Sequence, residues 1–266
     1  MRTAFLLCLA SLAFAAPAHA QPEDEEESAL CANRPGLASG PCTVERGRVQ
    51  AELQIDWSFQ DDGAERVDTL LAGDAFVRIG VDDRTEVQIG WTPFGQVRTR
   101  SAAGTDRVSG TGDVTLGVRH RMFQQGSVAA GLQATVSLPV GGSALGAGDW
   151  GAELLVPMSY DRGNLQWLVT PSVAAAVDAD GRGRHLAYGL AAGLGIGSFL
   201  TEELTAVLDL ALSRDEDPAG HATEALAGFA LAWQLNPDFQ LDAGVVIGLN
   251  ADSPDFELYV GAARRF

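Results

Sequence analysis

Apolar and polar side chains alternate along most of the chain with a period of two. In residues 48–59, for example, Val49, Leu53 and Trp57 alternate with Gln50 and Glu52. This period is typical of a β-strand with one apolar face, whereas a helix would spread the same apolar residues around its circumference. The pattern predicts strands at residues 48–59, 71–80, 85–94, 111–121, 128–138, 150–160, 165–175, 185–197, 204–213, 223–234, 239–249 and 256–266.

The last of these stretches has a feature that a soluble sheet does not require. Phe256, Leu258 and Val260 alternate with polar or small residues, and the chain ends on an aromatic residue, Phe266. A final alternating strand that ends in Phe resembles the C-terminal insertion signal of Gram-negative outer-membrane barrels. We therefore expect Phe266 to act as a membrane-insertion signal, and the remaining strands to close a barrel, because an open sheet edge cannot sit in lipid.

The connections between the expected strands also alternate. Those after odd-numbered strands are mostly longer or richer in charge, Gly and Ser, including a polar loop at 95–109, and those after even-numbered strands are mostly short. Short periplasmic turns and longer outer loops are typical of bacterial barrels, which have an even number of strands. The prediction is an all-β fold, a single transmembrane antiparallel up-and-down β-barrel of about 12 strands.

Charged side chains give a second test, because within the strand cores they lie almost entirely on one parity. A charge on the lipid face costs about 2–4 kcal/mol at the midplane, so the uncharged parity, with Leu71 among its members, is expected to face lipid. The charged parity is expected to face the lumen, either as a cation path or as solvated residues paired with Arg. The lumen-facing candidates are Glu52, Asp56, Asp74, Arg78, Glu86, Asp113, Arg119, Glu153, Asp209, Glu224, Asp242 and Glu257.

Aromatic residues on the uncharged parity gather near the strand ends. Amphipathic rings prefer the membrane–water interface, so two girdles are expected. The outer girdle would hold Trp57, Phe59, Trp150, Tyr188 and Phe256, and the periplasmic girdle Tyr160, Trp167, Trp233, Phe239 and Phe266.

Residues 186–200 allow a second interpretation, because they are nearly all apolar and Gly189, Gly193 and Gly197 are spaced by four. That spacing also occurs in paired helices. The stretch is shorter than the roughly 20 residues that a spanning helix needs. Spacing by four is also even, so it fits a strand with Gly on its inner face.

The N-terminal residues have the organisation of a secretory signal peptide. Arg2 precedes an apolar run, and Ala18-His19-Ala20 fits a cleavage site after Ala20. Consecutive acids at 23–27 then predict a disordered leader, with a plug segment as the alternative. The expected organisation is a signal peptide at 1–20, an acidic leader and Cys-stapled periplasmic segment at 21–46, and an outer-membrane β-barrel at 47–266.

Two cysteines remain after the signal peptide, Cys31 and Cys42, in a stretch rich in Pro and Gly. In an oxidising periplasm a closely spaced pair predicts a disulfide. A metal site is the alternative, but two thiols without a nearby His supply too few ligands.

Composition and motifs exclude several kinds of function. The formal net charge is −17, with 18 basic residues, all Arg, against 35 acids, so nucleic acid is not an expected partner. The sequence has no Ser-containing nucleophile elbow, metal-binding His pair or phosphate loop. Outer-membrane phospholipases with an outward Ser and His are the enzymatic alternative, but no outward Ser here lies beside a His. We therefore expect no enzyme activity and no cofactor.

Several stretches resemble one family when taken in order. They are CANRP at 31–35, GRVQAE at 47–52, GDVTLG at 112–117, SLPVG at 137–141, LDAG at 241–244 and the ending ARRF. Together they resemble outer-membrane transporters grouped with the meta-pathway of phenol degradation, over nearly the whole chain after residue 20. The usual Pro-x-Gly after the second Cys is Glu45-Arg46-Gly47 here. The resemblance implies an outer-membrane barrel with a transport role. It does not assign a function to any individual residue of this chain.

The expected function is therefore an outer-membrane channel or transporter for small molecules, with hydrophobic or aromatic compounds as candidate solutes, in a Gram-negative bacterium. The alternative is a filled structural barrel without transport activity. Expected partners are outer-membrane lipid, periplasmic chaperones, the barrel-assembly machinery and a small-molecule solute.

Overall fold

The computed structural model describes residues 30–177, 184–218 and 220–266. The expected signal peptide, the acidic run and most of the loop after residue 177 lie outside the described residues. The described residues form strands and connections, without a helix. None of them belongs to a helix long and apolar enough to cross a bilayer.

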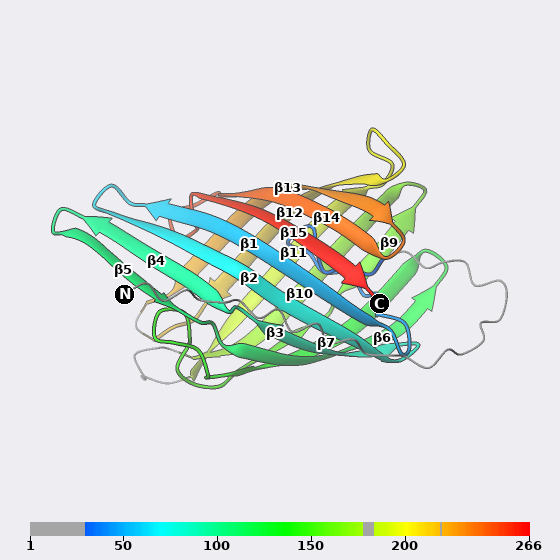
Figure 1. Ribbon diagram of the computed structural model, residues 1–266, viewed down its shortest axis with the longest axis horizontal. Coiled ribbons are helices and arrows are strands. Elements are labelled where there is room, and N and C mark those ends of the chain that lie inside the picture. Colours follow the sequence, from blue (N-terminus) through cyan, green and yellow to red (C-terminus); the bar gives the residue numbers. More distant parts are fainter. Residues whose placement is uncertain (1–29, 178–183, 219) are drawn as a thin grey trace, which may run out of the picture.

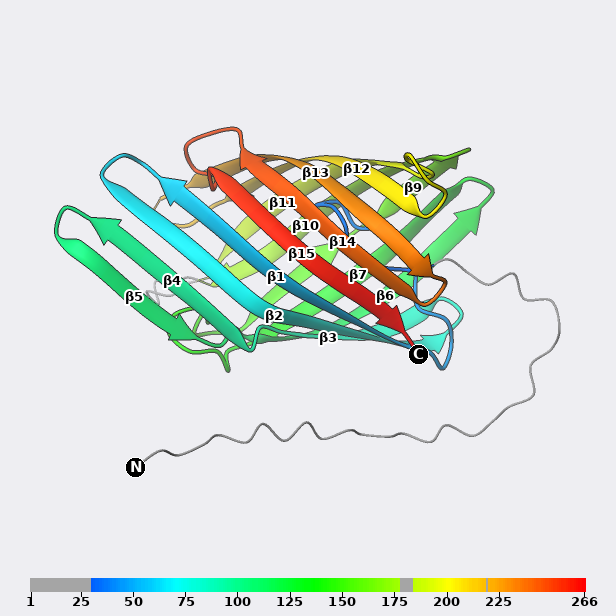
Figure 2. The same cartoon turned by 45° about the horizontal axis from the view of Figure 1, so that its top comes forward.

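The described strands form one antiparallel sheet whose neighbours follow the chain order, and β1 pairs with β15 to close it (Figures 1 and 2). We call the end where β1 begins and β15 ends the terminal end, and the other the loop end. The strands are β1 (Val49–Asp61), β2 (Glu65–Asp82), β3 (Thr85–Trp91), β4 (Phe94–Ser101), β5 (Gly104–Gly110), β6 (Val114–Gln125), β7 (Val128–Leu138), β8 (Gly151–Leu155), β9 (Met158–Arg162), β10 (Leu165–Val177), β11 (Arg184–Ile196), β12 (Leu204–Asp215), β13 (Ala222–Asn236), β14 (Phe239–Gly248) and β15 (Phe256–Arg265).

Within the described residues these 15 segments make a barrel of 12 strands, because three barrel strands are interrupted. β3 and β4 both pair with β2, and Pro93 lies between them. β8 and β9 both pair with β7 and β10, and Pro157 lies between them. Proline has no N–H to donate, so each break falls where the ladder would lose a bond. β5 and β6 continue one another opposite β4 and β3. The predicted closed antiparallel barrel is confirmed.

Residues 95–109 differ from the prediction, since they form the β4–β5 hairpin rather than a polar loop. The hairpin extends β2 and its neighbours beyond the loop end, as Figures 1 and 2 show. Its two faces both carry polar residues and Pro93 interrupts the alternation, so the period of two is hidden in the sequence. Backbone pairing with the long strand β2 decides the structure here.

A β-bulge in β2 makes one residue face the opposite side of the sheet from the side that was predicted. Gly73 has a φ of 77° and stands outside the ladder, where the register with β1 shifts. Beyond this bulge Leu71 lies opposite Asp56 and therefore shares its face. The extra residue reverses the parity of the loop-end half of β2, so the expected outward position of Leu71 is wrong.

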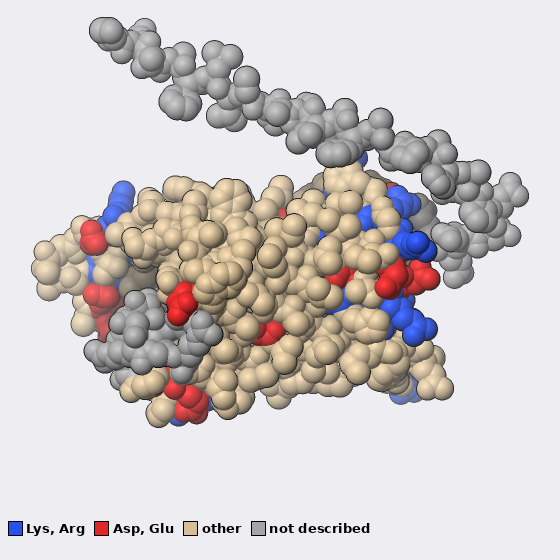
Figure 3. Space-filling view, turned by 90° about the horizontal axis from the view of Figure 1, so that it is seen from below, with Lys and Arg blue, Asp and Glu red and all other residues tan. Residues whose placement is uncertain are grey.

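The barrel is apolar outside and polar inside. On β1, Leu53 is 54% exposed whereas neighbouring Glu52 is 2% exposed. Large apolar side chains are exposed on almost every strand, and charged side chains gather mainly at the two ends of the face in Figure 3. This polarity, the reverse of a soluble protein's, is that of a barrel whose outer wall contacts lipid.

We predict that Leu208→Arg impairs membrane insertion by about 2–4 kcal/mol, because it places a charge in the middle of the lipid-facing wall. Leu208 is 48% exposed and lies between Leu194 of β11 and Phe229 of β13. The measurement is the fraction of heat-modifiable barrel formed in lipid vesicles across a urea series. Leu208→Ala, which keeps the face apolar, is the control and should insert better than the Arg variant; equal insertion by the two would contradict the assignment of the outer face.

Candidate functional site

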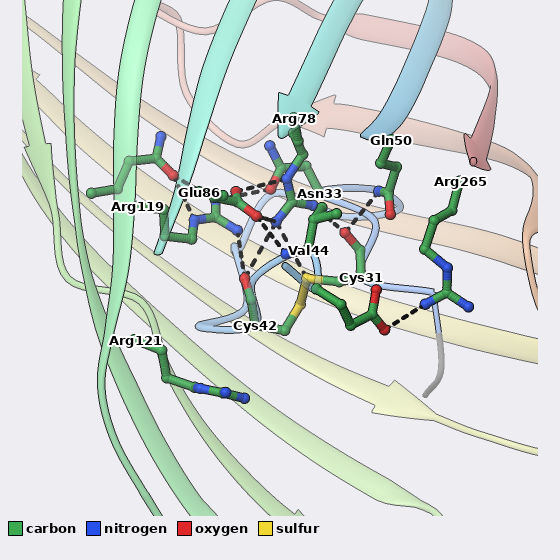
Figure 4. Close-up of a disulfide and its surroundings, with 12 residues drawn as sticks. Cys31, Asn33, Cys42, Val44, Gln50, Arg78, Glu86, Arg119, Arg121 and Arg265 are labelled. Atoms are coloured by element: carbon green, nitrogen blue, oxygen red, sulfur yellow. Dashed lines mark hydrogen bonds and ion pairs between the residues drawn. A yellow bond between two sulfur atoms is a disulfide. The ribbon is translucent and has the colours of Figure 1, made fainter. Parts of the chain in front are cut away.

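Residues 30–44, which precede β1, lie inside the barrel (Figure 4). This segment contacts side chains from β1, β2, β3, β6, β10, β12, β14 and β15, so it crosses the interior from one wall to the other. We call it the inner segment. The sequence predicts an acidic leader and Cys-stapled periplasmic segment at 21–46, with a plug segment as the alternative for the acidic run. The structure differs because polar groups of the inner wall bind the backbone of this segment.

A disulfide closes the inner segment into a loop. Cys31 and Cys42 are bonded, with their Cα atoms 5.9 Å apart, and the bond lies among the arginines of the wall (Figure 4). The disulfide predicted from the sequence is therefore present. It brings the Cys31 and Cys42 carbonyls to the same part of the wall.

Arg78 of β2 makes most of the contacts at this point. Its Nε donates to Glu86 Oε1 at 2.8 Å and its Nη2 to Glu86 Oε2 at 2.9 Å, a two-pronged ion pair. The same guanidinium donates to the carbonyls of Cys31 and Cys42 (Figure 4). Val44 N donates to Glu86 Oε2 at 2.7 Å. Arg78 and Glu86 are both fully buried. Each neutralises the charge of the other, and both form hydrogen bonds to the inner segment.

Arg119 of β6 extends this network. Its Nε donates to Gln133 Oε1 at 2.8 Å, and its Nη2 donates to Asn33 Oδ1 at 2.8 Å (Figure 4). Its Nη1 reaches the Cys42 carbonyl at 3.4 Å. From β1, Gln50 Nε2 donates to the Cys31 carbonyl at 2.8 Å. Wall side chains thus satisfy the segment's carbonyls, which would otherwise be buried without partners.

Arg34 anchors the middle of the inner segment. It donates to Gln54 Oε1 at 2.8 Å and to the Leu53 carbonyl at 3.0 Å, and its Nε lies 3.7 Å from Asp242 Oδ1. In return, Gln240 Nε2 donates to the Arg34 carbonyl at 3.0 Å. The segment is therefore bound from β14 as well as from β1.

The far part of the inner segment binds through its amides. Gly36 N donates to the Tyr259 hydroxyl at 3.2 Å and Ala38 N to Asp209 Oδ1 at 3.4 Å. Ser39 both donates to and accepts from the Thr170 hydroxyl, at 3.0 and 2.9 Å. Glycines on the inner face of the wall leave space for the inner segment. A Cβ at Gly193, for example, would lie only 3.3 Å from the Ala38 Cβ.

Two cavities remain on either side of the inner segment. One of about 530 Å³ is lined by the segment and by residues near the terminal end, including Arg121, Gln124, Asp161 and Gln240. Another of about 360 Å³ lies on the loop-end side and is lined by Asp74, Phe76 and Asp113 among others. Asn33 and Arg34 line both cavities. The inner segment thus divides the interior at these two residues.

A loop narrows the loop-end side of the interior. Asp113 accepts from Gly141 N at 2.8 Å and from Ala147 N at 2.9 Å, so residues 139–150 fold back over the start of β6. Leu145 in this loop and Leu71 of β2 both lie against Gly95, where an added Cβ would collide with Leu145.

The twelve candidates from the sequence fall into three groups. Glu52, Arg78, Glu86, Arg119, Asp209 and Asp242 contact the inner segment directly. Asp113 holds the loop, and Glu224 accepts from Ser213. Asp56, Asp74, Glu153 and Glu257 make no ion pair with a described residue.

The sequence did not predict several residues that bind the inner segment, because these residues are either uncharged or lie outside the strands. They are Asn33 and Arg34 of the segment itself, and Gln50, Thr170 and Tyr259 of the wall. One signal was available, since the inner parity carries four charged residues near the terminal end, Glu52, Arg78, Glu86 and Arg119. Among the described residues no group of three or more His, Cys, Asp or Glu could hold a metal ion.

A model of the family described as "Putative MetA-pathway of phenol degradation" matches residues 32–266. None of the curated proteins matches the chain. Among solved structures, the COG4313 outer membrane channel from Pseudomonas putida F1 superposes with a TM-score of 0.65 at 14% identity, covering 84% of this chain and 97% of that one. The NanC porin gives 0.51 at 10% identity, over 80% and 98% of the two chains. The β domain of the Bordetella autotransporter BrkA gives 0.53 at 11% identity, over 84% and 100%. These likenesses establish the fold of a Gram-negative outer-membrane barrel.

We predict that Glu86→Ala lowers the free energy of unfolding by about 3–5 kcal/mol, because it leaves Arg78 buried without its main counter-charge. Urea-induced loss of heat-modifiable barrel in vesicles measures this change. Glu65→Ala is the control, since that glutamate is exposed at the loop end of β2, and its effect should stay within about 0.5 kcal/mol. A similarly small effect at Glu86 would show that the buried pair contributes little.

Proposed function

Because the chain belongs to the family described as "Putative MetA-pathway of phenol degradation", we propose that it is an outer-membrane channel for small molecules. The observation that carries the proposal is that the inner segment divides the interior without filling it. Cavities of about 530 and 360 Å³ remain, and they meet at Asn33 and Arg34. A filled barrel has no need of such spaces.

The strand number supports a narrow path. About eight strands enclose only as much space as side chains fill, and sixteen or more leave a wide aqueous channel. A barrel of 12 strands with a segment inside it lies between these limits. The proposed solutes are therefore small molecules that pass one at a time.

Neutral aromatic molecules such as phenols are the proposed solute class. The family description supports this class, and so does the lining of the smaller cavity, where the Phe76 ring stands near Gly90 among polar groups. A ring stacks on an aromatic side chain while its hydroxyl binds a polar one. Growth of a deletion strain on a panel of carbon sources would identify the solute.

The alternative is a filled structural barrel. The many hydrogen bonds between the inner segment and the wall favour it, because they hold the segment in the interior. Conductance in planar bilayers distinguishes the two functions. We expect small, discrete conductance steps from the complete protein. We expect larger steps from a variant whose residues 30–44 are replaced by a Gly/Ser linker of the same length. Heat modifiability of both proteins serves as the folding control. Current at the bilayer baseline from both folded proteins would support the structural alternative.

We further predict that the path prefers cations or neutral solutes over anions. Asp56, Asp74 and Glu257 lie on the neighbouring strands β1, β2 and β15, respectively, and make no ion pair with a described residue. Acids lining a low-dielectric tube attract cations and repel anions. Reversal potentials in a salt gradient measure this preference. Asp56→Asn with Glu257→Gln should reduce it, whereas Asp62→Asn, in the exposed β1–β2 turn, should not. A clear anion preference of the unaltered protein would contradict the prediction.

A further inference from the structure

Four arginines gather on the outer face of the barrel at its loop end. Cross-strand neighbours share a face of a sheet. Phe59, on the outer face of β1, lies opposite Asp68 of β2, which lies opposite Arg98 of β4, and Arg98 lies opposite Arg107 of β5. One step further along the same face, Arg66 lies opposite Arg100. We call Arg66, Arg98, Arg100 and Arg107 the arginine patch.

The arginine patch exists because β2 and the β3–β4 strand change parity below it. The bulge at Gly73 and the break at Pro93 each reverse which residues face outward on the loop-end side of their strand. Without them, the alternation of lipid-facing and inward residues nearer the terminal end of β2 and β3 would continue unchanged to the loop end. The patch is thus built onto the wall that contacts lipid.

The charges of the arginine patch are not balanced by acids among the described residues. Asp68 accepts from Arg66 at 3.0 Å and from Arg100 at 2.6 Å. Arg98 and Arg107 make no ion pair with any described residue, and the Nε atoms of Arg98 and Arg100 are buried without a hydrogen-bond partner there. Even with Asp61 counted, which faces Arg66 and accepts from Gly63 N, arginines outnumber acids. This excess stands out in a chain whose net charge is −17.

An aromatic cluster fixes the depth of the arginine patch. Trp57, Phe59 and Phe256 pack together with ring centroids 5.5 to 6.2 Å apart, and the Arg66 guanidinium lies 4.1 Å over the Phe59 ring. Below these rings the face is apolar, with Ile55 exposed. Aromatic girdles mark the interface of a membrane barrel. A strand rises about 3.3 Å per residue, so the arginines stand within about 10 Å of the girdle, at the level of lipid headgroups.

We propose that the arginine patch binds the phosphate groups of an anionic lipid in the outer leaflet. Guanidinium groups match phosphate oxygens in pairs, and arginine is favoured where such two-pronged binding occurs. The lipid's acyl chains would lie on the apolar face below, beside Ile55 and Phe94, which are both exposed. Arg98 and Arg107 would contribute most, because neither makes an ion pair with a described acid. A free phosphate ion would gain no contact with that apolar face.

The test measures lipid retention by the complete purified protein in detergent micelles, using native mass spectrometry. The probes are bisphosphorylated lipid A, fully dephosphorylated lipid A and inorganic phosphate. We expect the bisphosphorylated lipid to bind about tenfold or more tightly than the dephosphorylated one, a difference of about 1.4 kcal/mol or more. Arg98→Gln with Arg107→Gln should remove this difference. Inorganic phosphate at the same concentration should not displace the lipid.

Arg84→Gln with Arg162→Gln is the matched control, because it removes the same charge from exposed positions at the terminal end, in the β2–β3 turn and at the end of β9. It should bind as the unaltered protein does, and heat modifiability confirms that both double variants fold. Three results would overturn the proposal. They are equal binding of the two lipids, an equal loss in the control, and displacement of the lipid by inorganic phosphate.

Discussion

The barrel depends on one set of backbone hydrogen bonds, those between β1 and β15. Their register runs without a shift from Gln50 opposite Arg265 to Phe59 opposite Phe256. Val49 and Phe266 exchange two further bonds at the terminal end. In lipid no water can satisfy an unpaired strand edge, so the apolar outer face is tolerable only once this seam is closed. The exposed leucines and aromatics of the wall have a favourable environment because the ladder has no edge.

Closure leaves an interior that must satisfy its own polar groups. The wall places Arg78, Glu86 and Arg119 there, and the inner segment supplies the carbonyls and amides that bind them. Each partner satisfies polar groups that the other would leave buried without partners, since buried charges need both counter-charges and hydrogen bonds. The narrowing of the path thus follows from the electrostatics of the wall.

The period of two was enough to predict the number of strands, their order and the inward parity near the terminal end. It could not predict the β4–β5 hairpin or the position of Leu71, because Pro93 and the bulge at Gly73 change the pattern through backbone geometry. Nor could it place the inner segment. Asn33, Arg34 and Gly36 each bind a wall residue between 86 and 228 positions away, and only the closed barrel brings these residues together. The disulfide was predictable because both its cysteines lie in one short stretch.

The way the inner segment is bound has a consequence for how the molecule opens. Among the described residues, no backbone–backbone hydrogen bond joins residues 30–44 to a strand, and every hydrogen bond to the wall uses a side chain on at least one partner. Displacing the segment therefore breaks none of the ladder. The wall and the segment are two separate cooperative units, and the smaller one can exchange its amides with solvent at a free energy below that of the barrel. The interior can rearrange while the seam that keeps the protein in the membrane stays intact.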